Sequence, residues 1–369
     1  MEREKQIRIC RDDDMDMMLV EDCCQILDSM RVPVTASDRE EGEYPYYGAN
    51  GIQDYVADYI FDDELVLLAE DGGNFGSKEK PIAYRVSGKC WVNNHAHVLK
   101  PKDGLDVDYL CYSLMFYKVG GMVNGATRQK LTQAAMCKMQ IPLRSMDEQK
   151  FIVDELNRII RIKEQRQQEL QLLDHLIKAR FVELFGDVQH EEKYKGIQLR
   201  ELCTTMSGGT PSTKFSEYYE GDIPWISTVS LGPNFIDGTT AKGYITQEAV
   251  ANSATKFIPA GNILFGTRVG VGKSSLNNVD ICINQDIVAI VGIDESKFNR
   301  LFIKYVLDAY QPYYDSIKKG ATILGITGDD LKDTLIPNVP IEIQNQFADF
   351  VHQVDKSKVV YQGCSQYIA

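Results

Sequence analysis

The chain repeats itself once, and this internal repeat constrains its fold more than any other feature. The segments VNNHAHVL at 92–99 and INQDIVAI at 283–290 lie 191 residues apart. The segments GATRQKLT at 125–132 and GATILGIT at 320–327 lie 195 residues apart, and an Ile-Pro pair and then a glutamine follow each of them at the same spacing. This period is far longer than that of a stacked solenoid repeat. The sequence therefore predicts a duplicated domain, each copy followed by its own connecting element.

Each copy combines short strands with a helix, so we predict an α+β fold. Apolar runs between glycine-rich loops predict strands. The expected strands are residues 64–69, 90–99, 262–265 and 281–291. A helix is expected after the second strand of each copy, at residues 106–118 and 297–310. The two copies are thus predicted to be similar domains.

A long helix is predicted after the first copy. Ser145 and Glu148 form the S-x-x-E pattern of a capping box at a helix start. The chain then continues to about Phe185 without Pro or Gly, and Gly186 is the expected stop. A helix of about 40 residues spans ~60 Å. An apolar seam of the coiled-coil kind follows it, with Lys163, Arg166 and Arg180 as interruptions. Its members are Ile152, Leu156, Ile159, Leu170, Leu173, Ile177 and Leu184.

A second seam follows the second copy and reaches the last residues. It contains Phe347, Val351, Val354, Tyr361 and Ile368, with Lys358 and Ser365 on the same face. We expect the two helices to pair as an antiparallel coiled coil that holds the two domains apart at opposite ends. The alternative is that each helix packs on its own domain. The expected organisation is domain 1 at 1–145, a central spacer helix at 146–187, domain 2 at 188–340 and a C-terminal spacer helix at 341–369.

Tests for catalytic motifs fail, which favours a protein that is not an enzyme. The segment GTRVGVGKSS at 266–275 resembles a phosphate loop, but the first glycine is one residue out of place and a strand is expected after it. Acidic residues with a following lysine match a nuclease pattern only at a turn and at a helix start. His95 and His97 alternate on an expected strand, and no third ligand is evident nearby, so we predict no metal site. The motifs of an adenine methyltransferase are absent from the sequence.

The overall charge argues against a nucleic-acid partner, and the cysteines argue against disulfides. Forty Lys and Arg against 53 Asp and Glu give a net charge of −13, whereas a basic patch is the usual mark of DNA binding. A local basic face or positive partner subunits could overcome this penalty. The nine cysteines contain no C-x-x-C, which favours buried reduced thiols. No apolar run approaches the ~18 residues of a membrane span. The charged N-terminus has no signal-like apolar region, so we expect a cytoplasmic protein.

Positive side chains recur on loops of both copies. Glycine allows close approach of a ligand to the backbone, and Arg and Lys can bind phosphates or guanine edges. A solvated loop charge is the simpler explanation of any single residue, but recurrence in both copies favours a function for the set. We therefore predict a DNA-binding set, in which Arg128 and Lys130 are taken as the counterparts of Lys318 and Lys319. The set is Lys78, Lys80, Arg85, Arg128, Lys130, Arg268, Lys273, Lys318 and Lys319.

The arrangement and several segments together resemble the specificity subunit of type I restriction–modification enzymes over essentially the whole chain. YPYYGANGIQDYV at 44–56 and LLAEDGGNFG at 67–76 look like a first target-recognition domain of that family, and GDIPWISTVSL at 221–231 looks like a second. MDEQKFIVDELNRI at 146–159 and ARFVELFGD at 179–187 resemble its central spacer helix and the exit from it.

The resemblance implies a non-catalytic DNA reader. Each target-recognition domain would read one half of a bipartite, asymmetric double-stranded site, and the spacer helices would set the gap and dock two methyltransferase subunits. Restriction subunits would then complete a DNA-translocating nuclease. S-adenosylmethionine, ATP and magnesium would be cofactors of those partners, with none in this chain. The short second helix departs from the pattern. The recognition subunit of a methylation-only defence system, or a protein-binding scaffold without DNA readout, stay open as alternatives.

Overall fold

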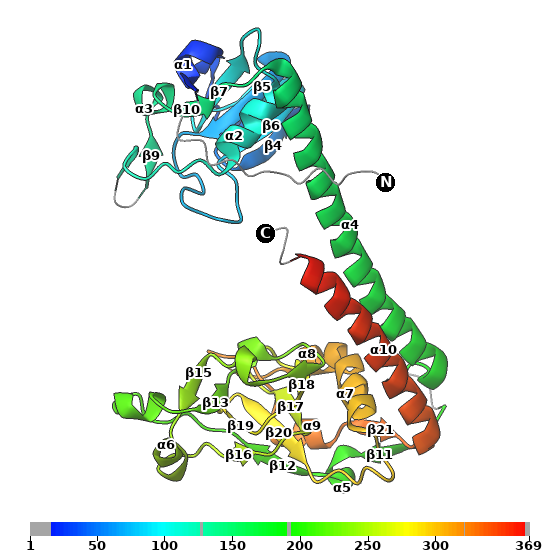
Figure 1. Ribbon diagram of the computed structural model, residues 1–369. Coiled ribbons are helices and arrows are strands. Elements are labelled where there is room, and N and C mark those ends of the chain that lie inside the picture. Colours follow the sequence, from blue (N-terminus) through cyan, green and yellow to red (C-terminus); the bar gives the residue numbers. More distant parts are fainter. Residues whose placement is uncertain (1–15, 126–127, 190–192, 321, 366–369) are drawn as a thin grey trace, which may run out of the picture. The chain divides into compact units, whose positions relative to one another are not determined.

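The computed structural model describes residues 16–125, 128–189, 193–320 and 322–365, with the side chains of the last helix described up to Lys358. The chain divides into two compact units, Met1–Lys163 and Glu164–Ala369. The division falls inside one continuous helix, α4 (Met146–Phe185). Each unit is described by itself below, and Figure 1 labels the elements.

Unit 1 is built on a six-stranded mixed sheet. Its strand order is β2 (Cys24–Ile26), β7 (Ala96–Pro101), β5 (Phe61–Ala69), β6 (Ala83–Val92), β3 (Glu41–Gly48) and β4 (Gly51–Val56). Two small ribbons are β1 (Met17–Leu19) with β10 (Gln140–Pro142), and β8 (Val123–Asn124) with β9 (Lys130–Leu131). The short helices are α1 (Val20–Cys23), α2 (Val107–Met115) and α3 (Gln133–Cys137).

Unit 2 contains two larger sheets. The first has the order β12 (Thr204–Ser207), β20 (Ile287–Val291), β17 (Ile263–Gly266), β18 (Ser274–Asn277) and β14 (Phe235–Ile236). The second has the order β15 (Gly243–Ile245), β13 (Ile223–Ile226), β19 (Ile281–Ile283) and β16 (Phe257–Ile258). A ribbon joins β11 (Gly196–Gln198) to β21 (Leu335–Pro337). The helices are α5 (Leu199–Leu202), α6 (Gln247–Ala251), α7 (Arg300–Ala309), α8 (Gln311–Ile317), α9 (Gly328–Lys332) and α10 (Ile341–Ser365).

The two units share a common framework, as the repeat predicts. The Ile-Pro pairs lie on β10 and β21, and the two isoleucines, Ile141 and Ile336, are fully buried. Each of these strands pairs antiparallel with the first strand of its unit, β1 or β11. The predicted helices are α2 and α7, which begin after the side-chain caps Asp106 and Asn299. The duplication therefore preserves the closing strand and the capped helix of the domain.

The prediction of single strands at 90–99 and 281–291 is wrong in both units. A turn separates β6 from β7, and an equivalent turn separates β19 from β20. At each turn a buried asparagine side chain accepts a backbone N–H two residues later: Asn93 from His95 at 2.8 Å, and Asn284 from Asp286 at 3.2 Å. This local bond favours a turn over a continued strand. Periodicity alone did not reveal it, because apolar residues flank the turn on both sides.

One buried glutamine in each unit fixes the start of a long helix to the domain. The Oε1 atom of Gln149 accepts the backbone N–H of the α2 cap Asp106 at 2.8 Å, and its Nε2 donates to the carbonyls of Gly104 and Arg144, both at 2.9 Å. Gln344 does the same in unit 2: its Oε1 accepts the N–H of the α7 cap Asn299 at 2.8 Å. Its Nε2 donates to the carbonyls of Lys297 and Val339, at 3.1 and 2.7 Å. Both glutamines are fully buried. The recurring glutamine of the sequence is thus a repeated structural joint.

In unit 2, α10 lies beside the second half of α4 (Figure 1), and the two helices run antiparallel. Lys358 of α10 forms an ion pair with Asp174 of α4 at 2.6 Å. The ring of Phe347, further towards the start of α10, contacts the rings of Phe181 and Phe185 near the end of α4, with centroids 5.4 Å apart in both pairs. The antiparallel pairing predicted from the seams is therefore present.

The paired helices share one hydrophobic core with the rest of unit 2. Phe302 of α7 contacts Phe185 of α4 with ring centroids 4.7 Å apart, and Tyr305 of α7 contacts Phe347 of α10 at 5.1 Å. Ile177, Val351 and the rings of α4 belong to the same buried cluster as the strands β17 and β20. Both arrangements considered from the sequence are therefore present in unit 2: the helices pair with each other, and they also pack on their domain.

Candidate nucleic-acid interface

Two segments that are distant in the sequence meet at one end of the unit 1 sheet. Residues 70–72 follow β5, and residues 128–131 precede α3. The backbone N–H of Leu131 donates to the carbonyl of Glu70 at 2.7 Å, and that of Gly72 donates to the carbonyl of Gln129 at 3.2 Å. We call this pair of segments the paired-loop site of unit 1. It brings together one glycine-rich loop and the repeated Gly-Ala-Thr loop.

Unit 2 has an equivalent paired-loop site, formed by residues 267–269 and 322–326. The backbone N–H of Ile326 donates to the carbonyl of Thr267 at 2.8 Å, as Leu131 does to Glu70 in unit 1. The N–H of Thr267 donates to the carbonyl of Asp286 at 2.8 Å, and in unit 1 the N–H of Glu70 donates to the carbonyl of His95 at 2.9 Å. These matching bonds establish which residues correspond in the two sites.

The loop backbone is shaped by the glycine that begins and the threonine that ends each repeated segment, 125–132 and 320–327. Gly125 and Gly320 have φ angles of +103° and +143°, which L side chains rarely adopt. A Cβ atom at either glycine would also collide with the carbonyl oxygen three residues later. The threonines that end the segments, Thr132 and Thr327, cap α3 and α9 with their side-chain oxygens. The repeat thus preserves backbone geometry, whereas the residues at 128–131 differ from those at 323–326.

Each paired-loop site presents one half-exposed arginine beside a mostly buried carboxylate. In unit 1, Nη2 of Arg128 lies 2.9 Å from Oδ1 of Asp71, which is also 2.6 Å from Nδ1 of His95. In unit 2, Nη1 of Arg268 lies 3.8 Å from Oδ1 of Asp286. Both arginine side chains are 58% exposed, whereas the two carboxylates are 19% and 15% exposed. Both arginine side chains are therefore partly exposed to solvent. Asp71 accepts a hydrogen bond from Arg128, whereas Asp286 is a longer-range ionic neighbour of Arg268.

Beneath the unit 1 site lies a buried cluster of charged groups. His97 is fully buried on β7; its Nδ1 lies 2.6 Å from Oδ2 of Asp28 and its Nε2 lies 2.9 Å from the carbonyl oxygen of Leu131. Both ring nitrogens of His97 therefore have an oxygen partner inside the protein. Arg31 donates to Glu70 at 2.6 Å, and Lys130 pairs with the same carboxylate at 2.9 Å. The cluster therefore connects the loop that carries Lys130 to the core.

The cluster also holds its carboxylates ionised. Burial disfavours the charge of Asp28, but the hydrogen bond from His97 and the charges of His97 and Arg31 outweigh it, so the pKa of Asp28 lies below its usual value. Burial likewise opposes ionisation of Glu70, and hydrogen bonds from Lys130 and Arg31 outweigh it, so the pKa of Glu70 is also lowered. Both groups are thus carboxylates at neutral pH.

The expectation that His97 has no ligand-type neighbours is wrong, because Asp28 and Glu70 come from distant parts of the sequence. One oxygen or nitrogen atom of each of the three residues lies within 4.8 Å of the others. However, Arg31 lies 3.4 Å from Asp28 and 2.6 Å from Glu70, so its guanidinium group already pairs with both carboxylates. The geometry is that of a buried ion-pair network. His95 was expected on the same strand, but it lies in the turn before β7.

The remaining predicted DNA-binding residues fall into two groups. Lys78, Lys80, Lys273 and Lys319 have exposed side chains, and none forms an ion pair within the described part of the chain. Arg85 was expected on a loop, which is wrong: it lies within β6 and pairs with Glu64 and Asp108. Lys318 follows α8 and pairs with Asp315. These two cations are therefore held by carboxylates away from the paired-loop sites.

The expected equivalence of Lys318 and Lys319 with Arg128 and Lys130 is also wrong. Lys319 forms a backbone bridge with Gly325, just as Asn124 of β8 pairs with Lys130 of β9 in unit 1. Lys319 therefore corresponds to Asn124, and Gly325 corresponds to Lys130. In both units positive side chains lie next to the Gly-Ala-Thr segment. They follow its glycine in unit 1 and precede it in unit 2.

In unit 2, the paired-loop site borders a polar pocket of about 600 Å³. The pocket brings the predicted residues Arg268 and Lys319 together with neutral polar side chains from three other segments. Its polar lining includes Ser207, Thr267, Gln285, Thr322 and Thr327. Sequence inspection missed Ser207 and Gln285, because isolated polar residues on short strands and turns carry no pattern. The pocket offers hydrogen-bond donors and acceptors, and its charged lining residues are Arg268, Lys319 and Asp330.

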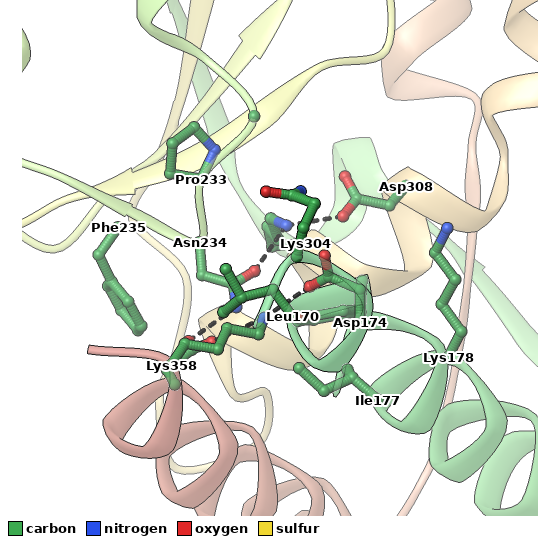
Figure 2. A pocket seen from close by; sticks show the side chains of 14 residues that line it. Leu170, Asp174, Ile177, Lys178, Pro233, Asn234, Phe235, Lys304, Asp308 and Lys358 are labelled. Atoms are coloured by element: carbon green, nitrogen blue, oxygen red, sulfur yellow. Dashed lines mark hydrogen bonds and ion pairs between the residues drawn. The ribbon is translucent and has the colours of Figure 1, made fainter. Parts of the chain in front are cut away.

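A second pocket of unit 2, of about 720 Å³, lies where the helix pair meets the domain and is shown in Figure 2. Its side chains form a connected polar network. Lys304 of α7 is 3% exposed, and its Nζ donates to Oδ1 of Asn234 at 2.8 Å and to Asp308 at 2.7 Å. Nδ2 of Asn234 in turn donates to Asp355 of α10 at 2.8 Å, and Lys358 joins Asp355 to Asp174 of α4. Lysines and aspartates alternate around this pocket, so its charges are balanced internally. We therefore regard it as a joint between helices and domain.

The predicted spacer seam is only partly buried. Ile177, Phe347 and Val351 are at most 1% exposed, and Val354 is 7% exposed. Leu170 and Leu173 are half-buried, and Phe181 and Phe185 complete the seam, although the sequence analysis placed Arg180 there and missed both rings. In unit 1, Ile152 and Leu156 are half-buried and Ile159 is 41% exposed. Aromatic residues one step away from the strict pattern were the signal that could have found the true seam.

Two stretches of the chain, residues 12–172 and 191–360, match the family model of the type I restriction modification DNA specificity domain. The chain therefore consists largely of two copies of a DNA specificity domain. Because these stretches cover most of its length, the protein belongs to the type I restriction–modification DNA specificity family. The resemblance inferred from the sequence is confirmed.

Named relatives and solved structures agree with this assignment. The chain is 26% identical over 348 residues to a Haemophilus influenzae protein named "Putative type I restriction enzyme specificity subunit S.HindORF215P", covering 91% of this chain and 86% of that protein. It is 31% identical over 165 residues to the EcoR124I/EcoR124II specificity subunit of Escherichia coli, covering 43% and 39% of the two chains. The crystal structure of the S subunit from M. genitalium aligns with a TM-score of 0.58 at 12% identity, over 98% of this chain and 95% of that one. The α+β fold with two similar domains and paired spacer helices is thus confirmed.

The structure was also searched for membrane-spanning helices. Among the residues it describes, no helix combines the length and the hydropathy needed to cross a bilayer.

Proposed function

We propose that this chain is the non-catalytic DNA-recognition subunit of a type I restriction–modification complex and binds a bipartite, asymmetric double-stranded site. The observation that carries the proposal is the repeated paired-loop site: each unit presents a half-exposed arginine from one of its two loops, with exposed lysines nearby. Duplicated domains with the same backbone and different loop side chains suit two different half-sites. The family assignment supports the same role.

The net charge of −13 limits how strongly the isolated chain can attract DNA. Phosphate contacts dominate the affinity of most DNA-binding proteins. A chain this acidic gains affinity if partner subunits close around the duplex and supply positive surface. We therefore propose that the assembled complex, and not the isolated chain, is the high-affinity DNA binder.

The outer face of α4 in unit 2 is a candidate docking surface for methyltransferase subunits. Leu172, Leu176 and Val182 lie on the side of the helix away from the buried seam, and their side chains are 64%, 48% and 57% exposed. Exposed apolar side chains in a row commonly mark a protein interface. Leu172→Glu together with Leu176→Glu should abolish co-purification with the methyltransferase, whereas Leu172→Met together with Leu176→Met, which keeps the face apolar, should leave it unchanged.

We propose that two methyltransferase subunits bind the spacer helices and that restriction subunits join them. S-adenosylmethionine, ATP and magnesium then belong to those partners. In this chain, the loop that resembles a phosphate loop leads into the strand β18 and not into a helix, whereas a nucleotide loop requires the helix that follows it.

A domain graft tests the proposal. Replacing residues 188–340 with those of another family member, in a cell that also expresses the neighbouring methyltransferase, should change one half of the methylated motif only. The matched graft of residues 1–145 should change the other half only. Methylome sequencing reads both results. A change in both halves after either graft would contradict independent reading, and no methylation by the wild-type complex would contradict the function itself.

A second test addresses the spacer. Four residues inserted after Gln167 add about 6 Å of rise and roughly one turn to α4. The gap between half-sites should lengthen by one or two base pairs, at ~3.4 Å each, while both half-sites stay the same. An unchanged gap in a fully active complex would refute the spacer role.

The same experiments separate the alternatives. Co-purification with a methyltransferase and a helicase-like nuclease supports the complete restriction system, whereas a methyltransferase alone supports a methylation-only system. Binding of partner proteins with no methylated motif and no DNA affinity would favour a protein scaffold.

A further inference from the structure

The arginine of the paired-loop site comes from opposite loops in the two units. Arg128 of unit 1 lies on the Gly-Ala-Thr loop, at the position occupied by Ile323 in unit 2. Arg268 of unit 2 lies on the loop after the strand β17, at the position occupied by Asp71 in unit 1. The backbone hydrogen bonds that define this correspondence are matched in both units. The arginine therefore lies on a different loop in each unit, although the backbone hydrogen bonds between the loops are the same.

In each unit, the arginine lies against a glycine of the opposite loop. A Cβ atom at Gly72 would be 3.2 Å from Nε of Arg128, and a Cβ atom at Gly325 would be 3.0 Å from Cγ of Arg268. Gly325 corresponds to Lys130, and Gly72 corresponds to Val269, so the glycine is exchanged together with the arginine. This reciprocal exchange retains one feature in both units: a guanidinium group at one place, half exposed to solvent.

The carboxylate beside each guanidinium also comes from a different sequence position in the two units. Asp71 is hydrogen-bonded to Arg128 in unit 1, and Asp286, the counterpart of His95, lies 3.8 Å from Arg268 in unit 2. A nearby carboxylate offsets part of the charge of each guanidinium, and the hydrogen bond from Arg128 to Asp71 also restricts its orientation. Such a group contributes little net attraction for phosphate, but it still offers several directed N–H donors. Lys319 forms no ion pair of this kind among the described residues, although Asp330 lines the same pocket.

We propose that Arg128 and Arg268 are specificity-determining residues, each donating two parallel hydrogen bonds to the O6 and N7 atoms of a guanine in the major groove of its half-site. Arginine is the side chain best suited to this bidentate contact. The proposal rests on the DNA-reading function proposed above and adds the residue that reads in each unit. The exposed lysines near the sites, Lys319 in unit 2 and Lys78 and Lys80 in unit 1, then contact phosphates.

The test uses the full chain assembled with its methyltransferase. The recognition site is first read from the wild-type methylome. The complexes carrying Arg128→Lys, Arg268→Lys and Lys319→Ala are then titrated against that site, and against every single-base substitution of it, at several salt concentrations. Arg→Lys keeps the charge and loses the bidentate geometry, whereas Lys319→Ala removes a charge from the same pocket and so serves as the matched control.

Each arginine variant should lose about 5- to 150-fold in discrimination at one G·C pair of one half-site. Arg128→Lys should affect one half-site, and Arg268→Lys should affect the other. The dependence of binding on salt should not change in these two variants. Lys319→Ala should weaken binding to all sequences and lower the salt slope by about one unit.

Several outcomes would overturn the inference. Uniform weakening of binding to all sequences, together with a lower salt slope in the charge-removing variants Arg128→Gln and Arg268→Gln, would make these arginines phosphate contacts. Wild-type discrimination in both lysine variants would show that the paired-loop sites do not read bases. A half-site without any G·C pair would exclude the guanine contact in that unit. Arg128→Gln and Arg268→Gln repeat the test if a lysine variant does not assemble. In all these outcomes the wild-type complex still binds its site, whereas its failure to bind DNA would refute the proposed function itself.

Discussion

Replacing the buried glutamine of one unit by an isosteric glutamate should release the start of the helix from that domain. Gln149 makes three hydrogen bonds, one accepted from the N–H of Asp106 and two donated to carbonyl oxygens. In Gln149→Glu the accepted bond survives, and the two donated bonds are replaced by contacts between a carboxylate and carbonyl oxygens. Two lost bonds cost about 2 kcal/mol, and burial of an unpaired charge adds more. We expect unit 1 to lose at least about 3 kcal/mol of unfolding free energy at neutral pH.

The pH dependence gives this prediction a distinct signature. The protonated carboxyl can donate one of the missing bonds, so the native state favours the neutral form and the pKa of the introduced glutamate rises above its unfolded value. A group with a raised folded pKa destabilises least below the unfolded pKa, about 4.3. The difference from wild type should therefore grow as pH rises from about 4, by ~1.4 kcal/mol per unit until the folded pKa is reached. Gln149→Ala should show a loss that does not depend on pH.

The two tryptophans of the chain make the assay specific for each unit. Trp91 lies in unit 1 and Trp225 lies in unit 2. In a Trp225→Phe background, fluorescence during urea unfolding of the full chain reports unit 1 alone, and Trp91→Phe isolates unit 2. Gln344→Glu is the matched variant and should shift only the Trp225 transition. Equal urea midpoints for Gln149→Glu and wild type at pH 7, or a loss that does not change between pH 4 and 7, would refute the reasoning.

Two further predictions use the same assay. Asp28→Asn leaves the buried ring of His97 without its carboxylate and should destabilise unit 1 by about 3–5 kcal/mol. In the wild type, the lowered pKa values of Asp28 and Glu70 mean that their contribution is present above about pH 4–5 and is lost as pH falls further, so the Trp91 signal should show acid unfolding there; an unchanged midpoint down to pH 3 would contradict this. Phe347→Ala should cost unit 2 about 3–5 kcal/mol, whereas the exposed Val182→Ala should stay within about 0.5 kcal/mol; similar losses in both would argue against the shared core.

The parts of the fold that depend on local pattern could be predicted from the sequence. The capping box is present, with the backbone N–H of Ser145 donating to Glu148 at 2.9 Å, and α4 ends at Phe185, before Gly186 with a φ of +76°. The antiparallel pairing of α4 and α10 also followed from their seams. These features depend on residues a few positions apart.

The rest depends on contacts between distant segments, which no periodicity records. Asp28 and His97 meet although distant in sequence, and Arg85 lies on a strand because β6 pairs with β5. For the candidate interface, the loops were predicted but their internal pairing was not. The exchange of Arg128 and Arg268 between loops became visible only when backbone hydrogen bonds aligned the two units.

In the paired-loop sites, the residues that fix the backbone differ from the residues proposed to contact DNA. The loops are shaped and anchored by Gly125, Gly320, Thr132 and Thr327, and main-chain hydrogen bonds join the two loops of each site in the same way. The side chains that face solvent from this frame contribute little to folding, so exchanging them changes stability by a few tenths of a kcal/mol at most sites. A gene of this kind can therefore accumulate substitutions at the loop surface while the encoded protein still folds and assembles. New target preferences can arise one side chain at a time, and a variant carrying arginine on both loops at once offers a path between the two arrangements.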